Sequence, residues 1–140
     1  MSHEHSTVIA GHRYRDAQAA IEWLVKVFGF EKHAVYTGPD GQVMHAQLTL
    51  GGGMVMLGSV RDDAYDKRFK TPSELGGIET RSQYIVVADA EAAYARAVDA
   101  GAEVISPLAE TYYGSKDFTL RDPEGFTWGA GTYDPWVRHT

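Results

Sequence analysis

Histidines are the side chains of this sequence best suited to acid–base or metal chemistry near neutral pH. His45 lies in the middle of a β-prone run, "VMHAQL", and shares a strand face with Gln47. Two interpretations stay open. His45 hydrogen-bonds a neighbouring strand or faces solvent, or it lines a cleft where it binds a ligand or moves a proton. His3, His5 and His12 could suggest a metal cluster, but His3 and His5 lie in a terminus that we expect to be frayed, which disfavours metal binding.

Several other chemistries are excluded by residue type or by context. The chain has no cysteine, so it has no disulfide, no thiolate metal site and no cysteine nucleophile. The run Gly51-Gly52-Gly53 predicts a hairpin turn rather than a phosphate loop, because no helix and no Lys-Ser/Thr pair follows it. No Ser-His-Asp arrangement can be derived from the spacing.

The stretch "RDPEGFTWGAG", residues 121–131, predicts a turn that leads into a strand. The turn is favoured by Pro123, which presets φ, and by Gly125, which accepts a positive φ. Beyond it, large and small side chains alternate, so one strand face carries Phe126, Trp128 and Ala130, and the other Thr127, Gly129 and Gly131. A strand with one nearly bare face is expected to line a space.

The elements that position these residues repeat along the chain. "DAQAAIEWLVKVFGFE" and "DAEAAYARAVDAGAEV" share the opening Asp-Ala-x-Ala-Ala and the ending Gly-x-Glu, and both place apolar residues on one helix face. Asp16 and Asp89 are predicted N-caps rather than catalytic acids. Gly29 and Gly101 occupy the positions where a helix C-terminus favours a positive φ.

Each helix is preceded by one β-prone run and followed by three. We therefore predict an α+β fold of two tandem βαβββ modules whose largely antiparallel strands form a curved mixed sheet around a cleft. Residues 6–60 form module one and residues 81–134 form module two. A charged linker over 61–80, with a short helix near 63–69, joins them, and residues 135–140 form a tail.

The bulk composition narrows the functional classes. The chain has 140 residues and a formal net charge of −6, which argues against nucleic acid and anionic membrane surfaces as partners. No apolar run approaches the roughly 20 residues that span a bilayer, and no signal-peptide pattern is present. A cytoplasmic location is therefore the expectation.

The two-module pattern, the "VFGFE" helix end and "YGSKDFTLRDPEGFTW" together resemble the vicinal oxygen chelate superfamily, which includes glyoxalase I, extradiol dioxygenases and bleomycin-type resistance proteins. The resemblance is greatest to the glyoxalase/bleomycin-resistance-like group. In its metal-dependent members, four strand positions each offer one ligand to a divalent ion. By this resemblance those positions correspond to Ile9, Met56, Gln83 and Gly129, a set that cannot hold a metal.

The resemblance therefore implies a metal-independent protein, without a cofactor, that binds a small hydrophobic or aromatic molecule, and antibiotic sequestration is one such role. The expected ligand-binding residues are His45, Met56, Gln83, Tyr113 and Gly129. No catalytic residue is assigned. The alternative is a glyoxalase-type lyase, isomerase or dioxygenase with one divalent metal, held by a set such as His45, Gln83 and Glu124. The resemblance also implies a homodimer.

Overall fold

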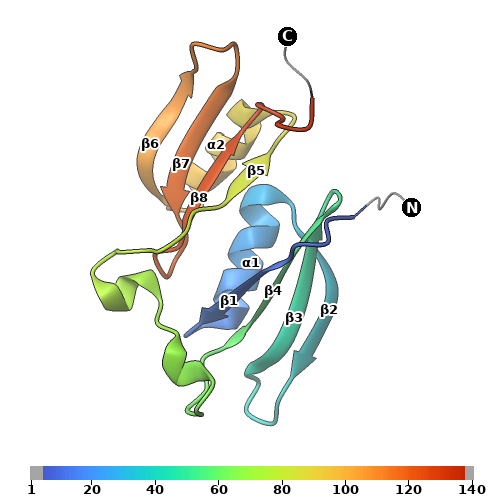
Figure 1. The fold of residues 1–140 in the computed structure, drawn as a ribbon, viewed down its shortest axis with the longest axis vertical. Helices are drawn as coiled ribbons and strands as arrows, with labels where there is room; N and C mark the ends of the chain where they lie inside the picture. The colour runs from blue at the N-terminus through green and yellow to red at the C-terminus, as the bar shows by residue number, and fades with distance from the viewer. Residues whose placement is uncertain (1–4, 138–140) are drawn as a thin grey trace.

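The computed structural model describes residues 5–137, which form two modules of one helix and four strands each (Figure 1). Module one contains β1 (Ala10–Tyr14), α1 (Ala17–Phe28), β2 (Glu31–Thr37), β3 (Val43–Leu50) and β4 (Gly53–Ser59). Module two contains β5 (Tyr84–Val86), α2 (Ala90–Asp99), β6 (Glu103–Glu110), β7 (Lys116–Arg121) and β8 (Thr127–Gly131). The predicted α+β architecture is confirmed.

The two helices begin as the repeat predicts. The carboxylate of Asp16 accepts a hydrogen bond from the backbone N–H of Ala19, and that of Asp89 accepts one from Ala92. Gly29 ends α1 with a φ of 81°. In module two Ala100 ends the helix and Gly101 follows with a φ of 79°, so both predicted glycines adopt the left-handed conformation.

The strands form two four-stranded sheets, in the order β1-β4-β3-β2 and β5-β8-β7-β6. Both sheets are mixed, because β1 runs parallel to β4 and β5 runs parallel to β8. In each module the helix carries the chain back, so the strand after it runs in the same direction as the strand before it. Two hairpins then reverse the chain twice, so the fourth strand also runs in that direction. The predicted mixed, largely antiparallel sheet is confirmed, with four antiparallel and two parallel strand pairs.

Each helix covers one face of its own sheet, as Figure 1 shows, and α1 also contacts α2. One hydrophobic core therefore extends across both modules. Trp128 of β8 joins them, because its ring lies 6.0 Å from that of Phe28 and 6.1 Å from that of Phe30, both in module one. Trp128 therefore packs against the end of α1, the helix of the other module.

The segment between the modules contains two short 3-10 helices, η1 (Asp66–Arg68) and η2 (Pro72–Leu75). The predicted helix near 63–69 is therefore reduced to one 3-10 turn. Thr71 and Glu74 form a capping box at the start of η2. No helix of the described residues is long and apolar enough to cross a membrane.

Candidate functional site

The face of each sheet that its helix leaves uncovered is called the open face here. On β4, Val55 and Leu57 are buried towards the helix, whereas Met56 is half-buried and belongs to the open face. On β8, Trp128 is buried towards the helix and Gly129 belongs to the open face. Alternation along a strand produces this division, so the predicted bare face of β8 is an open face.

The open face of module one offers sulfur, amide and aromatic groups. Met56 lies between Gly11 of β1 and Gln47 of β3 in the strand register. The Gln47 side-chain amide donates a hydrogen bond to His45 Nε2 at 3.1 Å. The His45 ring stacks on that of Tyr36, with 6.3 Å between the ring centres. His45 is therefore hydrogen-bonded within its own strand and stacked on a ring of β2, on the open side of the sheet, and its role in ligand binding stays a prediction.

The open face of module two is bordered by tyrosines. A Cβ atom added at Gly129 would meet only ordinary contacts, at 3.5 Å or more, with Gln83, Tyr84 and Thr119. The Tyr84 hydroxyl donates to the backbone oxygen of Tyr133 at 2.9 Å. The ring of Tyr133 lies 5.3 Å from that of Tyr113, which is half exposed. A bare spot with aromatic neighbours suits a flat apolar group.

Gln83 does not share a face with Gly129, although the family resemblance assigned both to one site. Tyr84 is the register partner of Gly129, and the Gln83 side chain turns to the opposite face. Its Oε1 accepts a hydrogen bond from His12 Nε2 at 3.0 Å, and its Nε2 donates to the Thr127 backbone oxygen at 3.2 Å. The apolar residues Ile85, Val86 and Val87 occupy both strand phases, so alternation did not show whether Gln83 or Tyr84 faces the open side.

The donor sets considered for a metal do not fit one. Ile9, Met56 and Gly129 have no side chain suited to a hard divalent ion. In the alternative set, Gln83 is bonded to His12, and the Glu124 carboxylate accepts backbone hydrogen bonds at the start of α1, from residues 15 and 16. Among residues 5–137 no group of three or more His, Cys, Asp or Glu side chains is arranged to hold a metal. His3 lies outside the described residues.

A buried polar network at the contact between the modules was missed by the sequence analysis. The Asp122 carboxylate accepts hydrogen bonds from the Tyr14 hydroxyl at 2.6 Å and from Trp128 Nε1 at 3.0 Å. Burial raises the pKa of Asp122, and these hydrogen bonds partly offset that effect. Burial raises the pKa of Tyr14 as well. These groups hold the modules together and are closed to solvent, which gives them a structural role.

His12 belongs to the same region and is only 3% exposed. Its ring stacks near Tyr14 and Trp128, at 5.8 and 5.4 Å between ring centres. Burial and then the charge of Arg81 lower the pKa of His12 from its ordinary 6.5 to about 4, although the hydrogen bond with Gln83 opposes the change. His12 is therefore neutral at pH 7, with Nε2 as the donor and Nδ1 buried without a hydrogen-bond partner among the described residues.

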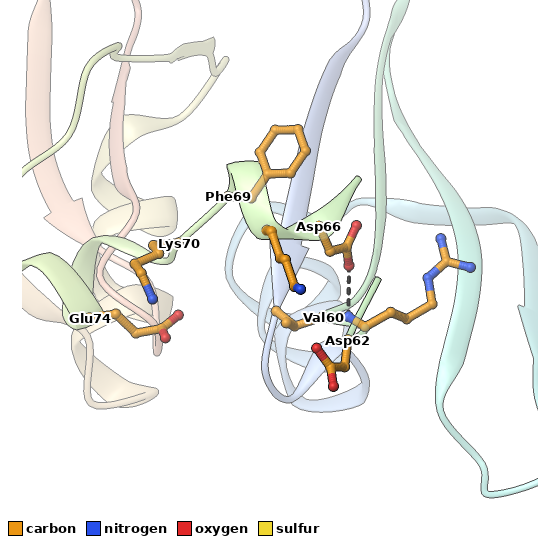
Figure 2. Close-up of a pocket in the computed structure, with 8 residues that line it drawn as sticks. Val60, Asp62, Asp66, Phe69, Lys70 and Glu74 are labelled. Atoms are coloured by element: carbon orange, nitrogen blue, oxygen red, sulfur yellow. Dashed lines mark hydrogen bonds between the residues drawn. The ribbon is translucent and has the colours of Figure 1, made fainter. Parts of the chain in front are cut away.

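Two neighbouring hollows, both open to solvent, lie beside the linker. The first, of about 370 Å³, lies over η1, where Asp66 bonds the backbone N–H of Arg61 (Figure 2). Its wall contains three bases and three acids: Arg61, Lys67, Lys70, Asp62, Asp66 and Glu74. The second, of about 310 Å³, lies between the linker and β1. None of the five predicted ligand-binding residues lines either hollow.

Two βαβββ modules, each with one sheet face free of helix, define the architecture of this chain. Comparison with known proteins identifies its family. The model of the Glyoxalase/Bleomycin resistance protein/Dioxygenase superfamily matches residues 9–129. An uncharacterised protein of Mycobacterium tuberculosis is 34% identical over 116 residues, which cover 83% of this chain and 68% of that protein. The chain belongs to the Glyoxalase/Bleomycin resistance protein/Dioxygenase superfamily.

Solved structures agree with this assignment. TioX from Micromonospora sp. ML1 is 29% identical with a TM-score of 0.69, over 90% of this chain and 97% of TioX. A family enzyme from Burkholderia phytofirmans PsJN is 22% identical with a TM-score of 0.62, over 88% of this chain and 94% of the enzyme. A glyoxalase I mutant from Zea mays is 16% identical with a TM-score of 0.69, over 89% of this chain and 44% of the mutant. The structures from Burkholderia phytofirmans and Zea mays show that the fold is shared with this chain and nothing more.

Proposed function

We propose that this chain is a metal-independent member of its superfamily that binds a small, flat hydrophobic or aromatic molecule on the open faces of its sheets. The observation that carries the proposal is the bare position at Gly129, with Tyr84 beside it and the ring pair of Tyr113 and Tyr133 on the same module. Tyrosine rings favour stacking on a planar partner, and glycine leaves the room for it.

The open face of module one supplies complementary chemistry. Met56 offers a polarisable thioether, which adapts to irregular apolar shapes. His45, paired with Gln47 and stacked on Tyr36, offers a polar edge. Met56 carries no formal charge that a neutral ligand would have to desolvate. Holding a molecule in this way removes it from solution without bond making, which is how an antibiotic would be sequestered.

The proposal includes a homodimer. Two copies related by a two-fold axis would cover each other's open faces, so that His45 and Met56 of one protomer could share a ligand with the tyrosines of its partner. A stable interface of this kind buries more than roughly 1,000 Å². Light scattering at tens of micromolar protein should therefore return twice the chain mass, and a monomer mass would count against the dimer.

The decisive experiment is a thermal-shift screen of planar antibiotics and aromatic metabolites against wild type, Gly129→Ala and Gly129→Leu. Both variants should fold, because the added Cβ meets only ordinary contacts. The leucine fills the space and should weaken a bound aromatic ligand by about 1 kcal/mol or more, whereas the alanine should weaken it much less. Ligands that stabilise wild type and Gly129→Leu equally would place the binding site elsewhere.

Elemental analysis of protein purified without a histidine tag tests metal independence. We expect no stoichiometric divalent metal and no turnover of methylglyoxal with glutathione above background. About one zinc, nickel, iron or manganese per chain, retained after mild chelation, would refute the proposal and favour a metal-dependent lyase, isomerase or dioxygenase.

A further inference from the structure

The two hollows beside the linker differ in charge, although both are lined by Phe69 and Lys70. Bases and acids are balanced in the hollow over η1. The hollow between the linker and β1, called the linker cavity here, has one acid and four bases in its wall: Glu79, Arg13, Arg68, Lys70 and Arg81. In a chain with a net charge of −6, this is a local excess of positive charge.

Three of these four bases make no ion pair among residues 5–137. Only Arg13 is matched, since its Nε lies 3.1 Å from the Asp66 carboxylate. Arg81 donates hydrogen bonds to Gln83 Oε1 and to the Gly11 backbone oxygen, both uncharged acceptors. The positive charge of Arg81 still reaches the cavity wall, because it contributes to the lowered pKa of His12. The cavity therefore favours an anion.

Apolar side chains form the remaining wall of the linker cavity: Phe69, Pro72, Leu75, Ile78 and Phe126. Leu75 is 47% exposed and Ile78 is 68% exposed, so both offer apolar surface to the linker cavity. Covering them with an apolar group would remove that surface from water. The cavity volume of about 310 Å³ limits such a group to a small organic molecule.

We propose that the linker cavity, which none of the five predicted ligand-binding residues lines, is a second binding site for a small organic anion with an apolar body. The anionic group, a carboxylate or sulfonate, pairs with the cations of Arg68, Lys70 and Arg81. The apolar body packs on Ile78 and Phe126. Because Phe126 comes from module two and Gly11 from module one, the ligand contacts the linker and both modules at once.

The test uses three probes of similar shape and different charge: naphthoate, neutral naphthylmethanol and cationic naphthylmethylamine. Proton–nitrogen correlation spectra of the full chain should show naphthoate shifting the backbone amides of Gly11, Ile78 and Arg81, and leaving those of Thr119 and Gly129 in place. Naphthoate should bind at least about tenfold more tightly than naphthylmethanol. Its affinity should fall as sodium chloride rises from about 50 to about 300 mM.

Matched variants separate this site from its surroundings. Lys70→Gln should weaken naphthoate about tenfold, and it should fold, because the Lys70 side chain has no hydrogen bond or ion pair among the described residues. Lys67→Gln removes the same charge from the same linker but from a residue outside the cavity, and should change affinity less than twofold. Ile78→Ser should weaken naphthoate through loss of the apolar wall.

Each contrary result would overturn the proposal. Equal binding of naphthoate and naphthylmethanol would remove the anion preference. Shifts centred on Gly129 would place the probe on the open face, and equal losses in Lys70→Gln and Lys67→Gln would reduce the effect to net charge. Gly129→Leu should leave naphthoate binding unchanged, so failure of the open-face site and failure of the linker cavity are distinguishable.

Discussion

Mild acid should destabilise this protein through His12. The folded state lowers the pKa of this imidazole to about 4, chiefly by burial, whereas the unfolded chain returns it to about 6.5. Between these two values the unfolded state binds more protons than the folded state. The free energy of unfolding therefore has its full value above pH 6.5 and decreases as the pH falls towards 4.

The size of the loss follows from the width of that window. Within it, each pH unit removes up to about 1.4 kcal/mol, and because the slope at pH 6.5 is only half of this, the loss between pH 6.5 and pH 5 is about 1.5 kcal/mol. A domain of ordinary stability has about 5–15 kcal/mol in total, so the effect is large enough to measure. Burial raises the pKa of Asp122, which acts in the opposite direction, because there the folded state binds the extra proton.

Urea unfolding followed by circular dichroism, at fixed protein concentration and at pH values from 4.5 to 8, measures this slope. His12→Phe keeps an aromatic ring in the stack with Tyr14 and Trp128, and Gln83 Oε1 keeps Arg81 as a donor. This variant should lose most of the slope between pH 6.5 and pH 5.

The exposed His33 supplies the control for this experiment. His33→Gln removes an imidazole from the surface and should keep the wild-type slope. The reasoning is refuted if His12→Phe and wild type show the same dependence on pH, because burial of His12 would then not control acid stability.

Three further outcomes follow from the geometry. Gly131→Ala should destabilise the fold by about 1–3 kcal/mol, because its Cβ would lie 2.9 Å from the Lys116 backbone oxygen and still closer to two side chains. Gly129→Ala, measured in the same urea titration, should be neutral or slightly stabilising. Asp122→Asn should lower the free energy of unfolding by about 2 kcal/mol or more, because the new side-chain amide would place its own N–H donors against the Trp128 N–H donor. An unchanged urea midpoint would contradict this. Tyr14→Phe should lower the free energy of unfolding by about 1–2 kcal/mol, because the Asp122 carboxylate loses one hydrogen-bond donor. Equal urea midpoints for Tyr14→Phe and wild type would show that this hydrogen bond contributes nothing.

Local chemistry made much of the fold predictable. Asp16 and Asp89 cap helices whatever surrounds them, because the acceptor oxygen and the unpaired N–H groups lie within one turn. Gly29 and Gly101 adopt a positive φ for an equally local reason. The β-prone run "VMHAQL" lies within β3, and the strand predicted after the turn at Pro123 and Gly125 is β8. Alternation also predicted the two faces of β8, since the pleat fixes that period.

The sequence by itself determined the two βαβββ modules, their caps and the bare face at Gly129, because each depends on neighbours a few residues away. Only the tertiary structure decided which face Gln83 occupies, since an apolar strand has no preferred phase until a partner such as His12 takes one side. Tertiary structure also decided that Asp122 meets Tyr14, and that linker cations gather beside β1. Those contacts join residues far apart in the chain, and packing between modules, which no local pattern encodes, sets their positions.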